Sequence, residues 1–539
     1  MTQTQKNFVK GAAILAIAGL IVKIIGAFFR IPLTNVVGTE GMGYYQLAYP
    51  VYSLLLVVST AGLPTAISKL VSERVAKDDY EGAHYTFQIA WRVLAILGVI
   101  TAILMFFLSG TIAKVQSTPP AIYSLMAISP ALFFVSILSA YRGYFQGLQY
   151  MVPTAISQIV EQVGKLGIGL FVAYLFLSIT GKPEMGAAGA LIGVSCSEAI
   201  SLLYMMIVYK RRKGEILLNI KNLDPKGATK NFKPIFKKIL AIAIPVTLGA
   251  CVMPIVMSID SVIVSRTLQS IGYAQKAATS MYGVLTGVVN PLINMPAVLS
   301  LALAMSLVPA ISQSKAQGDV QEMRNKSSFG LKLALLVGLP AATAFILLAQ
   351  PIIMLLYKSV QGSELVMATG LFQLLSLGVL FLTLVQTMTG ILQGMGKPFL
   401  PVYSLIVGAA VKIGVSLWLI SVPSINIYGA AIGTMACYAI AAVMDVVFVV
   451  RRSQFKLSLI NHILKPVLAT AVMGVVVFLV YRLLGGHSNT VGVLAAILIG
   501  LVVYVLALLL TGGLTKQELT MVPGGAKITK VMKKLKVWK

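Results

Sequence analysis

The stretch Val491–Leu510, VGVLAAILIGLVVYVLALLL, runs for 20 residues without one charged side chain. A helix of about 20 residues crosses the hydrocarbon core of a lipid bilayer. Because no water reaches the backbone in that core, the peptide groups must bond to one another within the segment, as they do in a helix. The stretch therefore predicts a transmembrane helix, and the rest of the chain repeats its pattern.

The composition of the whole chain is typical of a polytopic membrane protein. Of its 539 residues, 58% are hydrophobic and 11% are charged, whereas soluble domains carry about 25% charged residues. The alternating pattern of an outer-membrane barrel is absent. We predict an all-α polytopic membrane fold with 14 transmembrane helices, at residues 8–29, 42–70, 85–108, 121–145, 152–179, 186–209, 234–265, 277–312, 329–349, 365–392, 398–420, 428–450, 462–484 and 491–510.

The charge pattern predicts how the chain is oriented. It carries 43 Lys and Arg residues against 16 Asp and Glu residues, a net charge of +27. The basic residues gather in alternate loops, near 69–77, 210–238 and 451–456, and in the tail. Since such loops stay in the cytoplasm, we predict a multi-pass protein of the inner (plasma) membrane with both termini cytoplasmic. The surplus is thus explained by topology, and we expect no nucleic-acid partner.

An internal repeat divides the chain. Four short motifs occur twice, at residues 142–147 and 389–394, 163–169 and 410–416, 189–193 and 429–433, and 64–68 and 309–312. The copies lie about 245 residues apart. This predicts two parallel six-helix lobes around a central cavity, which rock against each other, plus two extra C-terminal helices.

The repeat also sets the predicted domains. They are an N-lobe at 1–210 with helices 1–6, a basic cytoplasmic linker at 211–233, a C-lobe at 234–452 with helices 7–12, helices 13 and 14 at 453–512, and a basic amphipathic tail at 513–539. The tail is expected to lie on anionic lipid headgroups.

Charged side chains inside the spans are the first candidates for function, because each one costs about 2.5–3.5 kcal/mol at a helix centre. Lys23 and Arg30 are seven residues apart in the first span, which places them on one helix face. A guanidinium fork and a compact ammonium suit a pyrophosphate. The alternatives are interfacial anchoring for Arg30, just before Pro32, and an internal ion pair for Lys23.

Four further charges are assigned to ion coupling or internal ion pairs. Glu161 and Lys165 are spaced i,i+4 in the favourable order, and we interpret them as a self-neutralising pair. Lys412 matches Lys165 in the repeat, but Gly408 stands where the acidic residue would be, so its partner must come from another helix or the substrate. Asp260 is expected to bind a sodium ion, take up a proton or pair with Lys412.

Polar residues in the spans complete the predicted site. Gln46, Asn290 and Asn294 are expected to line the cavity and contact the sugar or peptide parts of a substrate. Glu198 and Asp445 are further ionisable candidates, which we interpret as structural. The three cysteines all lie in apolar spans without metal-binding spacing, so no metal site is expected.

Several motifs together resemble a known family. They are Lys23–Arg30 (KIIGAFFR), Asn35–Gly38 (NVVG), Gly62–Ser68 (GLPTAIS) and Tyr141–Gly147 (YRGYFQG). The chain resembles, over essentially its whole length, the polysaccharide-biosynthesis, stage V sporulation protein B-like branch of the multidrug/oligosaccharidyl-lipid/polysaccharide (MOP) flippase superfamily. This branch is similar to MurJ-type lipid II flippases.

The resemblance carries functional expectations. It implies that the cations of the first helix engage the pyrophosphate of a lipid, and that the two extra helices form a groove for its polyprenyl tail. Some relatives hold sodium between helices 7, 11 and 12. Lys412 stands in that neighbourhood, and its ammonium would take the electrostatic role of such an ion.

We predict a flippase that moves a polyprenyl-pyrophosphate-linked cell-wall precursor, with lipid II favoured, from the inner to the outer leaflet by alternating access. The partners are this lipid-linked saccharide, membrane lipids and, as a candidate, the cell-wall synthesis machinery. No enzymatic activity and no cofactor are expected. Because no Walker motif is present, the membrane potential or a cation gradient is expected to give direction.

Four alternatives remain open at this point. The first is a flippase for another lipid-linked polysaccharide. The second is a cation-coupled multidrug exporter, which predicts a cavity rich in carboxylates. The third is a lipid-linked glycosyltransferase or ligase, which needs acid and base groups on long external loops. The fourth is a scaffold of the sporulation or division machinery, which leaves the intramembrane charges unexplained.

Overall fold

The computed structural model describes residues 3–223, 232–455 and 458–513, and in these ranges every regular element is a helix. Thirteen helices are long and apolar enough to cross a membrane. The first of them, Ile17–Val75, has 59 residues and contains the greater part of the first predicted span (8–29) and all of the second (42–70). The all-helical fold with 14 spans is therefore confirmed. The tail from residue 514 on, and residues 224–231 of the predicted linker, lie outside the described residues.

The first helix, α1 (Gln3–Thr60), is a hairpin of two spans. Its backbone leaves the helical conformation at Gly38, where φ is 71°. The guanidinium carbon of Arg30 lies 6.0 Å from the centre of the Tyr49 ring, whereas in a straight helix 19 residues span about 28 Å. The chain therefore folds back at Gly38, and a positive φ favours glycine at this point.

The chain forms two compact units, Met1–Val288 and Val289–Lys539. The first unit holds the six predicted N-lobe spans and also the seventh span, with the start of the eighth. The predicted lobe boundaries stay a prediction. After α1, the elements of the first unit, with π-helical turns labelled η, are α2 (Leu63–Val75), α3 (Tyr80–Val115), α4 (Ala121–Gly147), α5 (Met151–Gly164), η1 (Lys165–Gly169), α6 (Leu170–Thr180), α7 (Pro183–Leu223), α8 (Phe232–Ser270), α9 (Gln275–Gly283) and η2 (Val284–Val289). The unit ends at Val288, one residue before the end of η2.

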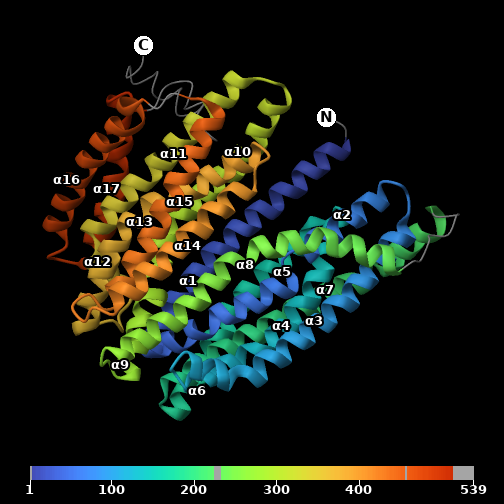
Figure 1. Cartoon of the computed structure of the whole chain (residues 1–539), viewed down its shortest axis with the longest axis horizontal. Helices are drawn as coiled ribbons and strands as arrows, with labels where there is room; N and C mark the ends of the chain where they lie inside the picture. The colour runs from blue at the N-terminus through green and yellow to red at the C-terminus, as the bar shows by residue number, and fades with distance from the viewer. Residues whose placement is uncertain (1–2, 224–231, 456–457, 514–539) are drawn as a thin grey trace. The chain divides into compact units, whose positions relative to one another are not determined.

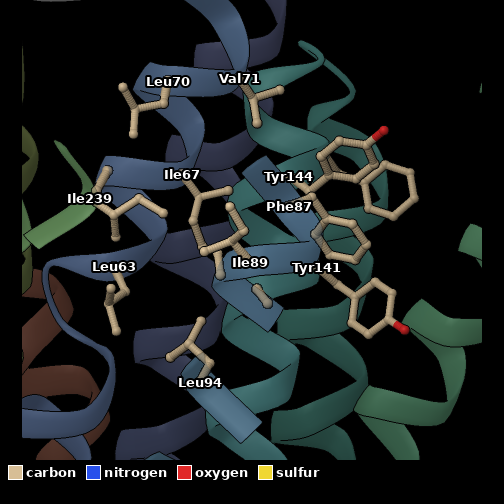
Figure 2. Close-up of a cluster of buried hydrophobic side chains, with 14 of the residues drawn as sticks. Leu63, Ile67, Leu70, Val71, Phe87, Ile89, Leu94, Tyr141, Tyr144 and Ile239 are labelled. Carbon is tan, nitrogen blue, oxygen red and sulfur yellow. The ribbon is translucent and has the colours of Figure 1, made fainter. Parts of the chain in front are cut away.

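A hydrophobic core cluster of the first unit lies between α2, α3, α4, α7 and α8. Figure 2 shows Ile67, Phe87 and Tyr144 turned toward one another in this core. The rings of Phe87 and Tyr144 are stacked with their centres 4.4 Å apart, and such pairs add about 0.5–1.5 kcal/mol beyond the burial of their area. This packing fixes α4 and α7, which carry two of the charged residues described below.

The fifth span is not a regular α-helix. It runs from α5 through the π-helical turn η1 into α6, so that Lys165 begins the π-turn. A π-turn inserts extra backbone into a helix and is frequent at functional sites.

The second unit holds the other spans. Its elements are α10 (Asn290–Ala316), α11 (Val320–Leu347), α12 (Ala349–Leu356), α13 (Gly362–Gly394), α14 (Phe399–Ile420), α15 (Tyr428–Ser453), η3 (Ile460–Leu464), α16 (Lys465–Leu484) and α17 (Asn489–Leu510). The two extra helices α16 and α17 lie side by side (Figure 1). The Tyr504 hydroxyl of α17 donates to the Leu336 carbonyl of α11 at 2.9 Å, which attaches the pair to the rest of the unit.

Glycine contacts correct the register of the internal repeat. A methyl group on Gly143 would lie 2.9 Å from the Pro64 carbonyl oxygen, and one on Gly390 would lie 2.8 Å from that of Ala304. The α4 and α13 glycines match at a spacing of 247 residues, but the spacing between their contacts is 240. Pro64 therefore corresponds to Ala304, and the predicted match to Pro309 is wrong by five residues, about 1.4 helical turns. The error arises because the motif at 309–312 resembles that at 64–68 although it lies beyond the matching position.

Candidate functional site

Four charged side chains meet inside the first unit. The Lys165 Nζ atom lies 2.6 Å from Glu161 Oε1 and 2.9 Å from Glu198 Oε1. The other oxygen of Glu161 accepts from Arg142 Nη2 at 3.0 Å. We call Arg142, Glu161, Lys165 and Glu198 the charge network. It joins α4, α5, η1 and α7, and with all four groups ionised its positive and negative charges balance.

The network is well shielded and supported by hydroxyl groups. The side chains of Arg142, Glu161 and Lys165 are 13–16% exposed and that of Glu198 is 2% exposed. Arg142 Nε donates to the Ser157 hydroxyl at 2.9 Å, and the Ser201 hydroxyl donates to the Ser157 carbonyl at 2.8 Å. Since a shielded charge is tolerated only when it is paired, the removal of any one member leaves the others uncompensated.

Arg30 lies against an aromatic wall that leads to this network. Its guanidinium faces the ring of Tyr49, and Tyr49 stacks on Tyr45 with ring centres 5.9 Å apart. Tyr45 interacts electrostatically with both Arg30 and Lys165. In the part of the chain that the structure describes, no carboxylate pairs with Arg30. The guanidinium N–H groups are thus held beside an aromatic face with no acidic partner from these residues.

Lys23 shares a helix face with Arg30. Gly26 stands between them on this face, and a methyl group on it would lie 3.3 Å from the Gln162 side-chain oxygen. The face that carries both cations therefore turns toward α5, next to Glu161. Within the chain the Lys23 side chain is exposed and Arg30 is half-buried. No described carboxylate lies within ion-pair distance of Lys23.

The predicted polar residues have varied surroundings. Gln46 is buried, and its amide donates to the Thr286 carbonyl of η2 at 2.5 Å, so it joins two helices within the first unit. Asn294 is exposed on α10, and its amide donates to the Asn290 carbonyl at 2.7 Å. Asn290 itself is half-buried. Of these residues, Asn294 presents the most side-chain surface for contact with another molecule.

The two remaining predicted charges lie in different units. Asp260 is half-buried on α8 of the first unit, and Lys412 is 8% exposed on α14 of the second. Their pairing stays a prediction. Asp445 of α15 is fully buried, and its Oδ1 accepts from the Ser404 hydroxyl at 2.6 Å. In the described ranges no group of three or more His, Cys, Asp or Glu residues could hold a metal ion.

Sequence reasoning did not place two members of the network beside Glu161 and Lys165. Arg142 appears in the sequence only as part of the Tyr141–Gly147 motif, and Glu198 was interpreted as structural. The internal repeat contained a usable signal, because Arg142, Lys165 and Glu198 all lie in or next to repeated motifs. Their charges, however, are not repeated as a set in the second copy.

Comparisons with known proteins concern the family and the fold of this chain. The family model "Polysaccharide biosynthesis protein" matches residues 8–315, and the MatE model matches residues 245–418. The chain is 27% identical to stage V sporulation protein B of Bacillus subtilis over 527 residues, which cover 96% of this chain and 98% of that protein. It is 26% identical to the lipid II flippase MurJ of the same organism, with 89% of each chain covered.

A solved structure shares the fold. The structure described as "Lipid II flippase MurJ, inward closed conformation" matches with a TM-score of 0.64 and 18% identity, covering 92% of this chain and 97% of that one. At this identity the likeness concerns the fold alone.

Proposed function

Since this chain belongs to the polysaccharide biosynthesis protein family, and is a multi-pass membrane transporter of the MOP superfamily rather than an enzyme, we propose that it flips a polyprenyl-pyrophosphate-linked cell-wall precursor. Lipid II is the favoured substrate. The headgroup passes from the inner to the outer leaflet through a cavity that opens alternately on each side. Both termini lie in the cytoplasm in this proposal.

The single observation that carries the proposal is the state of Arg30. The guanidinium is half-buried, lies against Tyr49 and has no acidic partner among the described residues. Contact with an aromatic face orients a guanidinium while its N–H groups stay available. A diphosphate presents several acceptor oxygens to this planar fork and forms charge-assisted hydrogen bonds with it. Lys23 on the same face adds a second positive charge.

Three further observations support an anionic lipid over a cationic drug. A cation-coupled drug exporter needs carboxylates that face its substrate, whereas the acidic groups of the charge network are already paired with cations. The helices α16 and α17 supply additional apolar surface, on which the exposed side chains of Leu494, Leu498 and Leu501 suit a polyprenyl chain. A relative described as a lipid II flippase is 26% identical over most of both chains.

The test is complementation in cells depleted of their lipid II flippase, with a probe for lipid II on the outer leaflet. The full chain is expected to restore outer-leaflet lipid II, and the Arg30→Ala variant to reduce it about tenfold or more, since charge-assisted hydrogen bonds contribute about 1.5–3 kcal/mol each. Arg30→Lys keeps the charge without the fork and is expected to fall between them. Arg482→Ala, an exposed arginine at the end of α16, is the matched control and should act like wild type.

A flippase for another lipid-linked polysaccharide is the second candidate, favoured by the family model itself. It predicts that the chain fails to restore lipid II transport but restores the export of a different polyprenyl-pyrophosphate saccharide, with the same dependence on Arg30. If Arg30→Ala transports as well as wild type in both settings, the assignment of the headgroup site is wrong.

A further inference from the structure

The carboxyl group of Glu198 is the most shielded member of the charge network. It is 2% exposed, and only Oε1 has a partner, Lys165 Nζ at 2.9 Å. The other oxygen, Oε2, is buried without any hydrogen-bond partner in the described chain. A buried carboxylate oxygen that forms no hydrogen bond is strongly disfavoured while it bears charge.

The groups around Glu198 come from four packed elements. Lys165 of η1 contacts it directly, and Glu161 of α5 and Arg142 of α4 interact with it electrostatically. Tyr52 of α1 also interacts with Glu198 and is buried. Two carboxylates therefore share one ammonium, while Glu161 is the one carboxylate of the network that the Arg142 guanidinium contacts. The like charge of Glu161 further disfavours the ionised form of Glu198.

We propose that Glu198 takes up a proton from water, and that this protonation strengthens the binding of a phosphate-bearing headgroup at Arg30 and Lys165. The proton adds to Oε2, the oxygen without a partner. Lys165 keeps its own proton and its bond to Glu161. The network then changes from neutral to a net charge of +1, and Lys165 is held by one carboxylate in place of two.

Protonation of Glu198 and binding of the anionic headgroup are therefore coupled. An added positive charge beside Tyr45 and Arg30 raises the affinity of the site for a pyrophosphate, and by reciprocity the bound pyrophosphate favours protonation of Glu198. The network is not closed off completely within the chain, because the side chains of Glu161 and Lys165 are 13% and 16% exposed. The proton site does not depend on the proposed function, whereas the headgroup coupling rests on it.

The first experiment detects the proton directly in the full chain, purified in lipid nanodiscs without substrate. Infrared difference spectra between about pH 8 and about pH 5 should show the band of a buried protonated carboxyl group. The band should be absent in Glu198→Gln and shifted in Glu198→Asp. It should persist in Glu73→Gln, since Glu73 is an exposed acid at the end of α2. A band unchanged in Glu198→Gln overturns the proton site.

The second experiment measures how an isoprenyl pyrophosphate probe binds to the same samples. Wild-type affinity is expected to rise about tenfold on acidification, within the range typical of coupled sites. Glu198→Gln, which mimics the protonated carboxyl group, should bind tightly at every pH. A Glu198→Gln variant with the wild-type pH dependence overturns the coupling. If the infrared band behaves as expected but no variant binds the probe, the proton site stands and the proposed headgroup function fails.

Discussion

Lys165 in the first unit and Lys412 in the second occupy matching positions of the repeat, 247 residues apart. Their helices differ, because Lys165 begins a π-turn whereas Lys412 lies within the regular helix α14. The neighbours differ as well. At the same spacing Glu161 is replaced by Gly408, and at the spacing of 240 that relates the sixth and twelfth spans Glu198 is replaced by Tyr438.

A pair of matching serines shows the same contrast. Ser157 accepts a hydrogen bond from the Arg142 guanidinium, whereas Ser404 donates one to the Asp445 carboxylate. The first unit thus supports a cation at this place and the second an anion. One helical scaffold therefore carries two different charge arrangements, of which the first is balanced within itself and contains a carboxyl group suited to bind a proton.

The largest effect is expected from Glu161, the acid on which both cations of the network depend. Glu161→Gln leaves Arg142 without its ion pair and weakens the hold on Lys165, and the removal of one partner of a buried pair costs about 3–5 kcal/mol. Thermal unfolding of the purified protein should show a clear loss of stability, whereas Glu73→Gln at an exposed pair should not. Wild-type stability in Glu161→Gln would mean that the network does not stabilise the first unit.

The next test asks whether the second unit could hold the same network. A methyl group on Gly408 would lie 2.7 Å from the Cys437 carbonyl oxygen, so Gly408→Ala is expected to lose about 1–3 kcal/mol by overpacking. The same change at Gly414, on the same helix, meets no atom within 4 Å and should be neutral or slightly stabilising.

Gly408→Glu extends this test, since it restores an acid at the position that matches Glu161. It should destabilise the protein at least as much as Gly408→Ala, because the larger side chain meets the same close helix contact. A Gly408→Glu variant of unchanged or higher stability would show that packing does not prevent a second network.

A smaller effect is expected at the turn that brings Arg30 back against Tyr49. Gly38 has a φ of 71° and a ψ of 179°, a region that is essentially restricted to glycine, and a side chain there costs on the order of 1 kcal/mol. Gly38→Ala should lower the unfolding temperature and weaken binding of the pyrophosphate probe. Gly19→Ala in the same helix, where an added methyl group meets no atom within 4 Å, provides the control. Equal behaviour of the two variants would contradict a strained turn at Gly38.

The smallest effect is expected from Tyr49. Tyr49→Leu removes the aromatic face beside Arg30, a contact that contributes about 0.5–1 kcal/mol at a partly exposed site. Affinity for the probe should fall by about two- to fivefold, and Tyr49→Phe, which keeps the ring, should retain it. If both variants lose affinity equally, the hydroxyl group and not the ring is the important part of this residue.

The number and type of the spans could be predicted from the sequence because each span is determined by one continuous run of apolar residues. The hairpin at Gly38 is also local, since a gap in hydropathy separates residues 8–29 from 42–70. The register of the repeat could not be fixed from the sequence, because the motif at Pro309 resembles that at Pro64 although it lies five residues beyond the matching position Ala304. Contacts between helices were needed to decide it.

The charge network was predictable only in part. Glu161 and Lys165 are one turn apart, so their pairing follows from helix geometry alone. Arg142 on α4 pairs with Glu161, which is 19 residues away, and Glu198 on α7 pairs with Lys165, which is 33 residues away. The sequence does not show which faces of these helices meet. The surroundings of Gln46 could not be predicted from the sequence for the same reason. Its burial against η2 depends on how the helices pack.

The central claim is that Arg30 binds the pyrophosphate of a lipid during transport, and reconstitution tests it most directly. Purified wild-type chain and Arg30→Ala are placed in liposomes that contain a labelled polyprenyl-pyrophosphate saccharide, and its appearance in the opposite leaflet is timed. The account predicts transport by wild type and a reduction of about tenfold or more in the variant. Equal rates for the two proteins, at equal reconstitution and stability, would contradict it.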